Sequence, residues 1–321
     1  MPGRQMWPAR PSPPGGDACG WPYWASAPKS TPKPEETSLE ALSGMYRPRT
    51  IEEAVALLAR DPEAKPISGG ATFVAMMNAR VVEPAALVSL AGIEEIRGIT
   101  VMDDGRIRIG AFTRHCETAQ CGLALGASAV VPHAASQIAN ATVRNMGTIG
   151  GSISFADPGL DYPPALVAAD AVIELASTAG RRTVPAAAFF VDWYTTALEP
   201  GEIVTAVILP RPAGGTGTYV KHARVSGDYA TASVAAAVDG QGRWRVAVGA
   251  CGPTPLSSEE VNTLLSRDRG DAALAEAGAA LMALADPLDD VRGSADYRRL
   301  LIPRLLARAV RDVETSLGGQ A

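Results

Sequence analysis

Residues 144–152 read Arg144-Asn145-Met146-Gly147-Thr148-Ile149-Gly150-Gly151-Ser152, a stretch punctuated by glycine. Glycine inside an otherwise extended run usually marks a bulge or a close approach of the backbone to a ligand. The pattern therefore predicts that residues 144–155 are extended and that the part from Thr148 to Ser152 lies against a bound molecule.

Two carboxylates follow this stretch, at Asp157 and Asp161. A carboxylate can accept hydrogen bonds from two hydroxyls of a ribose or ribityl chain. Asp157 has an alternative interpretation as a helix cap, because Pro158 behind it suits the first position of a helix. Residues 158–169 are expected to form that short helix.

A second glycine pair lies earlier, in Ser68-Gly69-Gly70-Ala71-Thr72, between a strand-like run at 65–68 and a helix start at 71–77. Consecutive glycines let the backbone turn at positive φ and point several amides into one concavity. The helix start adds a partial positive charge, so a pyrophosphate could be held there without lysine or arginine. A tight strand–helix turn is the simpler alternative. Two such segments in one domain suggest a ligand with both a diphosphate and a sugar.

The rest of the chain mixes strands and helices without a regular βαβ alternation, which is typical of an α+β fold. Thr50 and Glu53 form a capping-box pattern that opens a helix. The remaining expected elements are strands at 86–90, 172–175, 203–209, 218–224, 232–238 and 244–250, a hairpin over 99–110, helical pieces over 113–138, and helices near 257–266, 271–285 and 296–316. The G-x-G-x-x-G fingerprint of a Rossmann fold is absent.

Composition excludes several classes of function. The 321 residues carry a net charge of −5, which gives no basic field for nucleic acid, and no apolar run is long enough to span a membrane. The four cysteines (Cys19, Cys116, Cys121 and Cys251) and three histidines lack metal-ligand spacing, so reduced thiols in a cytoplasmic protein are expected. Residues 1–34 hold nine prolines, and residues 1–44 are expected to be disordered.

Four blocks together resemble the FAD-binding (medium) subunits of the molybdenum hydroxylase, or xanthine dehydrogenase, family, which include the medium subunit of aerobic carbon monoxide dehydrogenase. Residues 69–77, with Arg80 and Pro84, resemble the first FAD loop of that family, and residues 144–161 resemble the second. Residues 190–202, which include Tyr194, match a third block. Residues 252–255 resemble a part of the C-terminal domain.

The resemblance implies a domain plan and a set of partners. Residues 45–213 would form a PCMH-type FAD-binding domain of two α/β subdomains, and residues 217–321 a smaller α+β domain of a three-stranded sheet plus helices. FAD would bind to this chain. A large partner subunit would carry molybdopterin-bound molybdenum and a small one two 2Fe–2S clusters, in a dimer of heterotrimers that passes electrons to an external acceptor.

The same resemblance assigns individual residues to the cofactor. The two glycine segments would cradle the diphosphate, and Asp161, with Asp157 nearby, would bind the sugar-like part. Apolar side chains that would line the cleft are those of Phe73, Ile138 and Val204. Tyr194 and Lys221 would tune the flavin, although Lys221 could instead be a solvated charge on an edge strand. Ala71 departs from the glutamine or histidine of many relatives, which removes one side-chain hydrogen bond.

Two other functions compete with this one. A stand-alone flavin oxidase of the vanillyl-alcohol-oxidase type would share the FAD-binding plan, but it would need a substrate domain larger than the C-terminal segment of about 105 residues. A flavin-free assembly scaffold would keep the fold alone. No side-chain nucleophile or general base stands out, so we expect the flavin to be the redox centre.

Overall fold

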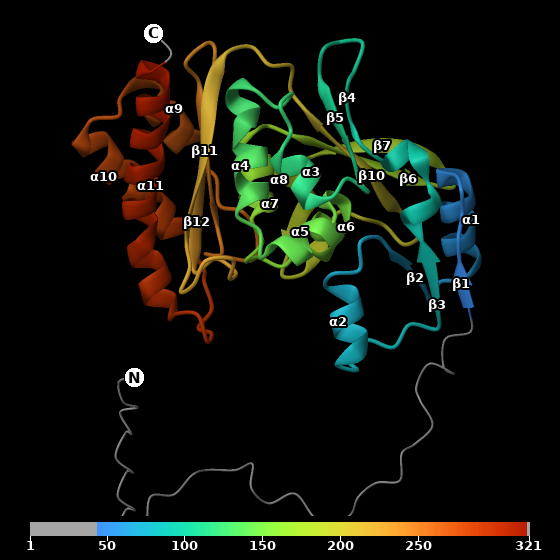
Figure 1. Cartoon of the computed structure of the whole chain (residues 1–321). Helices are drawn as coiled ribbons and strands as arrows, with labels where there is room; N and C mark the ends of the chain where they lie inside the picture. Colours follow the sequence, from blue (N-terminus) through green and yellow to red (C-terminus); the bar gives the residue numbers. More distant parts are fainter. Residues whose placement is uncertain (1–43, 320–321) are drawn as a thin grey trace, which may run out of the picture. The chain divides into compact units, whose positions relative to one another are not determined.

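The computed structural model describes residues 44–319 (Figure 1). The expected disordered extension at 1–44 lies outside the described residues except for its last residue, and Cys19 lies outside them as well. The fold is therefore that of residues 44–319.

A small parallel sheet with strand order β1-β3-β2 opens this segment. Its strands are β1 (Gly44–Tyr46), β2 (Ala64–Ile67) and β3 (Ala86–Ser89), accompanied by helices α1 (Ile51–Arg60) and α2 (Phe73–Asn78). Thr50 caps α1 as expected, since its hydroxyl accepts from the amide of Glu53 at 3.1 Å. The Glu53 carboxylate accepts from the amide of Arg49 at 2.7 Å rather than from Thr50, so the reciprocal half of the box closes one residue earlier.

A five-stranded antiparallel sheet, in the order β4-β5-β10-β6-β7, forms the second subdomain. Its strands are β4 (Ile99–Val101), β5 (Ile107–Gly110), β6 (Val172–Ser177), β7 (Gly180–Pro185) and β10 (Ile203–Leu209). The central strand β10 is buried along its whole length. Sequence analysis missed β7, because an exposed edge strand that begins Gly-Arg-Arg-Thr carries little hydrophobic signal.

Short helices surround this sheet, namely α3 (His115–Ala119), α4 (Val130–Ser136), α5 (Ala141–Met146), α6 (Ile149–Phe155), α7 (Tyr162–Ala168) and α8 (Ala186–Phe189). Smaller pieces are the 3₁₀ turns η2 (Leu90–Gly92), η3 (Glu94–Ile96) and η4 (Gly126–Ala129), and a hairpin of β8 (Phe190–Asp192) and β9 (Thr195–Thr196).

The prediction that residues 144–155 are extended is wrong, because α5 and α6 occupy this stretch. Side-chain caps start both helices: Asn140 accepts from the amide of Val143 at 3.0 Å, and Thr148 from that of Gly151 at 3.2 Å. Glycine serves close packing here, since a Cβ on Gly150 would lie 2.5 Å from the Cβ of Ala111.

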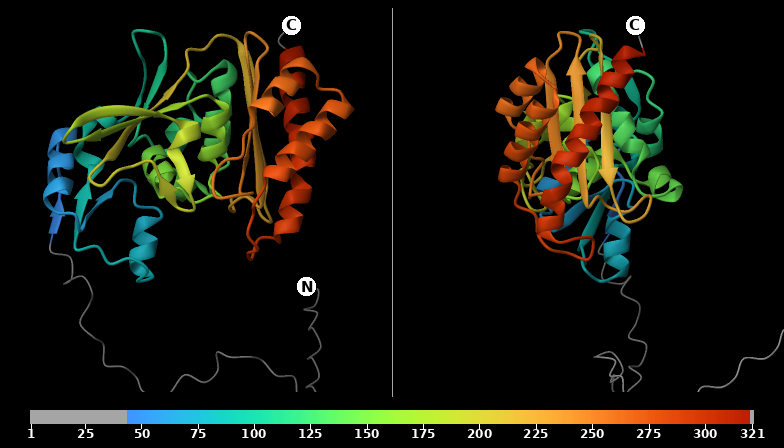
Figure 2. Two further views of the ribbon diagram at one scale, coloured as in Figure 1. Left: turned by 180° about the vertical axis from the view of Figure 1, so that it is seen from behind. Right: turned by 90° about the vertical axis from the view of Figure 1, so that its left-hand side faces the viewer.

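The C-terminal domain is a three-stranded antiparallel sheet with helices, as the family resemblance implied. Its strands are β11 (Gly215–His222), β12 (Ala232–Asp239) and β13 (Trp244–Gly249), and its helices are α9 (Glu259–Arg267), α10 (Asp271–Leu284) and α11 (Ala295–Gly318). Figure 2 shows these helices on one face of the sheet, while α4 and α7 of the preceding domain contact the other face. Tyr219 and alternate alanines of β12 consequently belong to the core of the first domain.

Among the helices of the described segment, none is both long and apolar enough to cross a membrane.

Candidate functional site

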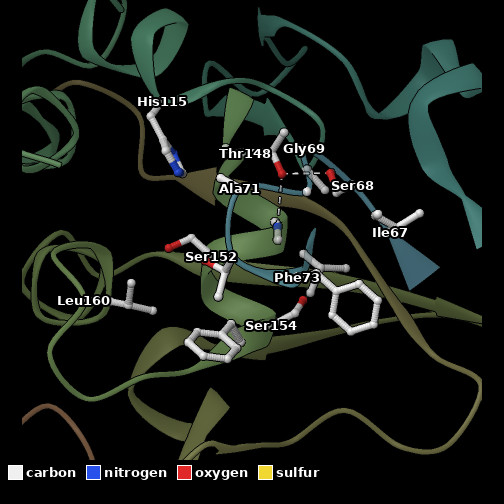
Figure 3. Close-up of a pocket in the computed structure, with 18 of the residues that line it drawn as sticks. Ile67, Ser68, Gly69, Ala71, Phe73, His115, Thr148, Ser152, Ser154 and Leu160 are labelled. Carbon is white, nitrogen blue, oxygen red and sulfur yellow. Dashed lines mark hydrogen bonds between the residues drawn. The ribbon is translucent and has the colours of Figure 1, made fainter. Parts of the chain in front are cut away.

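A cavity of about 390 Å³ opens where three parts of the fold meet. Loop 68–73 of the first subdomain, helices α5 and α6 and the turn at 160–161 of the second, and the 227–229 turn of the C-terminal domain all contribute to its wall (Figure 3). Most of the residues predicted for cofactor binding line it, namely Ser68, Gly69, Gly70, Ala71, Thr72, Phe73, Ile138, Thr148, Gly150, Gly151, Ser152, Asp161 and Val204.

The two glycine segments touch each other at this cavity. The hydroxyl oxygens of Ser68 and Thr148 lie 2.8 Å apart, within hydrogen-bonding distance. Gly69 packs directly on the other segment, because a Cβ there would lie 1.8 Å from the carbonyl oxygen of Met146. The fold thus brings together two loops that are about 80 residues apart in the chain.

The backbone amides of the first loop are available to a ligand. Within residues 44–319, no protein group accepts a hydrogen bond from the amides of Gly69, Gly70, Ala71 or Thr72. Gly70 turns the chain at φ +76°, and α2 begins immediately after the loop. Unpaired amides at a helix start favour an anion such as a diphosphate.

The second glycine segment offers a different surface. The Ile149 amide donates to the carbonyl of Thr113 at 3.0 Å and the Gly150 amide to that of Ala111 at 2.9 Å, while Thr148 occupies the Gly151 amide. The side chain of Ile149 is fully buried and does not line the cavity. This segment therefore contributes hydroxyls and a close-packed glycine wall rather than free amides.

Asp161 reaches the cavity as part of a buried charged cluster. Its carboxylate accepts from the Tyr219 hydroxyl at 2.7 Å and pairs with the Lys221 ammonium at 2.9 Å, and Lys221 also donates to the carbonyl of Gln137 at 2.8 Å. Burial raises the pKa of Asp161, and both partners oppose that rise. The Lys221 side chain is only 6% exposed, so the alternative of a solvated edge charge is wrong. Lys221 does not line the cavity but holds a residue that does.

Asp157 and Tyr194 lie outside the main cavity, in a neighbouring pocket of about 100 Å³. The Tyr194 hydroxyl donates to Asp157 at 3.2 Å, and its ring meets the edge of Phe155, which does line the main cavity. Asp157 accepts from the amide of Gly159 at 2.8 Å and so closes a turn. It does not cap α7, which begins four residues after Pro158.

His115 and the turn of Asp228 and Tyr229 also line the cavity, and the sequence did not predict this. His115 is 5% exposed, with Nδ1 3.2 Å from the hydroxyl of Tyr162. Burial, aided by the positive charge of Arg144, lowers the pKa of His115 to about 4. No local pattern could reveal this placement, because each partner of His115 lies at least 29 residues away in the chain.

Comparison with known families agrees with this geometry. Residues 38–212 match the family described as the FAD binding domain in molybdopterin dehydrogenase, and residues 217–313 match the CO dehydrogenase flavoprotein C-terminal domain. The chain belongs to the flavoprotein-subunit family of the molybdenum hydroxylases. The free amides, the glycine contacts and the buried carboxylate fit a dinucleotide such as FAD.

Similar proteins align with this chain over nearly their whole length. The carbon monoxide dehydrogenase medium chain of Hydrogenophaga pseudoflava is 35% identical, over 83% of this chain and 94% of that one. The glyceraldehyde dehydrogenase medium chain of Sulfolobus acidocaldarius is 32% identical, over 83% and 96%. A solved structure of the Hydrogenophaga pseudoflava carbon monoxide dehydrogenase matches with a TM-score of 0.81 at 34% identity, covering 85% of this chain and 98% of that one.

Proposed function

We propose that this chain holds FAD in the cavity between its two glycine segments and serves as the electron-exit subunit of a molybdenum hydroxylase. Electrons arrive from two 2Fe–2S clusters on a small partner subunit and leave to an external acceptor. The observation that carries the proposal is the row of unpaired amides at 69–72, in residues that line the cavity of an FAD-binding family member. Bound flavin supplies the chemistry, because it can take up electrons singly and release them in pairs.

The chain's own residues bind and orient the cofactor. The amides from Gly69 to Thr72 donate to the diphosphate, and the Asp161 carboxylate accepts from hydroxyls of the sugar-like part. Ile138 and Val204 provide apolar walls that exclude water. Lys221 is a positioning residue that fixes Asp161, and Tyr194 lies next to this site through its contact with Phe155.

The rest of the assembly follows from the family. A large subunit carries molybdopterin-bound molybdenum and selects the substrate. The similar chains named for carbon monoxide and for glyceraldehyde differ in substrate but share this domain plan. We infer a dimer of heterotrimers in the cytoplasm, because the chain belongs to a family whose similar members are named as medium chains of larger dehydrogenases.

Absorption spectroscopy of the purified chain tests the cofactor assignment. Added FAD should bind and show flavin bands that bleach with dithionite. Alcohols and aldehydes added without partner subunits should leave the bound flavin oxidised, whereas the oxidase alternative requires turnover by this chain alone. A protein that stays colourless in excess FAD would be an assembly scaffold, and the proposal would then be wrong.

A further inference from the structure

His115 is a buried polar side chain with one ring nitrogen unused by the protein. Nδ1 faces the hydroxyl of Tyr162 at 3.2 Å, whereas Nε2 has no hydrogen-bond partner within residues 44–319. Nε2 is unpartnered but not fully buried, so it reaches accessible space. Because His115 lines the main cavity and is 5% exposed, that space is the cavity.

The ring lies beside both glycine segments. The His115 amide donates to the carbonyl of Gly147 at 3.0 Å, and a Cβ on Gly147 would lie 2.5 Å from Nε2. In Figure 3 the imidazole extends toward the part of the cavity where Ala71 and Thr148 lie. The free amides from Gly69 to Thr72 line the same cavity. Nε2 and these amides therefore face a common space.

Tyr162 sets which ring nitrogen carries the proton. Its complete burial raises the pKa of the phenol, so the hydroxyl stays protonated and needs an acceptor. Both Nδ1 of His115 and the side chain of Thr118 lie within reach of this hydroxyl, and we assign Nδ1 as its acceptor. With that direction the imidazole proton lies on Nε2, because a neutral imidazole has one donor and one acceptor. Burial keeps the ring neutral near pH 7 by lowering the pKa of His115. In this assignment the ring presents an uncharged donor to the cavity.

We propose that Nε2–H of His115 donates a hydrogen bond to the FAD diphosphate, opposite the amides at 69–72. The inference rests on the proposed function, since it requires FAD in this cavity. It adds a side-chain donor on α3 to a site otherwise built from loop amides. A fixed neutral donor suits this position, because it needs no counter-ion in the apoprotein.

Two substitutions test the roles of the two ring nitrogens of His115 separately. His115→Asn keeps a polar atom near Nδ1, facing Tyr162, but removes the group that reaches the cavity. His115→Gln keeps a donor near the position of Nε2. A hydrogen bond to a charged group predicts a roughly 10- to 100-fold rise in the FAD Kd for the asparagine variant. The glutamine variant should stay within a few-fold of wild type.

Fragments of the cofactor locate the contact. With ADP as the probe, the asparagine variant should lose affinity as it does with FAD, whereas riboflavin binding should be unchanged. Tyr162→Phe leaves the imidazole in place but no longer fixes which ring nitrogen carries the proton. It should therefore weaken ADP binding by a smaller factor than the asparagine variant does. This variant provides the test on its own if the asparagine variant does not fold, as judged by thermal melting.

The outcomes distinguish this inference from the function on which it rests. Wild-type protein that binds no FAD would refute the function itself. Wild-type binding with equal ADP affinity in the asparagine and phenylalanine variants would show that His115 only supports the fold. Loss of riboflavin affinity with ADP unchanged would place the contact at the flavin end and overturn the diphosphate assignment.

Discussion

Gly69 meets a steric requirement that other residue types do not satisfy. Any Cβ would overlap the backbone of Met146, so the contact between the two loops depends on the missing side chain. The sequence predicted a turn at Gly69-Gly70 and a close backbone approach to a ligand at Gly150-Gly151, but not this contact between the two loops. The roles of His115 and Lys221 could not be predicted in the same way, because each depends on partners from distant elements.

The Asp161–Lys221 pair yields a prediction at the same scale. Lys221→Met leaves a buried carboxylate without its cation, which should cost about 3–5 kcal/mol of unfolding free energy. Adding Asp161→Asn should restore part of that loss, because the unpaired charge is then gone. Urea denaturation of both single variants and the double variant measures the coupling. Additive losses would show that the two groups do not interact.

This variant should also change how stability depends on pH. Burial raises the folded-state pKa of Asp161 above its unfolded value, and removing Lys221 raises it further. A raised carboxyl pKa means that the folded state binds the proton more tightly than the unfolded state does. The resulting loss of unfolding free energy is present above that pKa and disappears as pH falls through it. The stability gap between wild type and Lys221→Met should therefore narrow in acid.

At the scale of elements, α6 shows how the sequence pattern misled. Glycines at 147–151 looked like an interrupted strand, yet Thr148 caps a helix in which Gly150 packs on Ala111, the residue after β5. Strand β10 and the C-terminal strands β12 and β13 were predictable, because apolar runs mark buried strands regardless of tertiary context. Edge strand β7 depends on packing that no local window contains.

The cap of α6 can be tested against a matched cap elsewhere. Thr148→Ala removes the cap and the contact with Ser68, whereas Thr50→Ala removes only the cap of α1, away from the cavity. Each should lose about 1 kcal/mol of unfolding free energy. FAD affinity should fall only in the Thr148 variant, because its loop at 68–72 loses a tether. Equal FAD affinity in both variants would contradict a role for this contact.

At the scale of the molecule, the cavity belongs to no single subdomain. The parallel sheet supplies the loop with free amides, and the antiparallel subdomain supplies helices α5 and α6 with the turn at 160–161. The C-terminal domain contributes its turn at 227–229 and the lysine that fixes Asp161. The order of motifs along the chain indicated a shared site. The buried hydrogen bond from Tyr219 of β11 to Asp161 could be seen only in the folded structure.

A flavin titration of two glycine variants tests the central claim, that FAD lies between the two glycine segments. Gly69→Ala forces the loops apart, whereas Gly122→Ala places its Cβ in open space and serves as the control. Wild type and the control should each bind one FAD per chain, and Gly69→Ala should lose most of its affinity while still melting cooperatively. Full FAD binding by a folded Gly69→Ala protein would contradict the account.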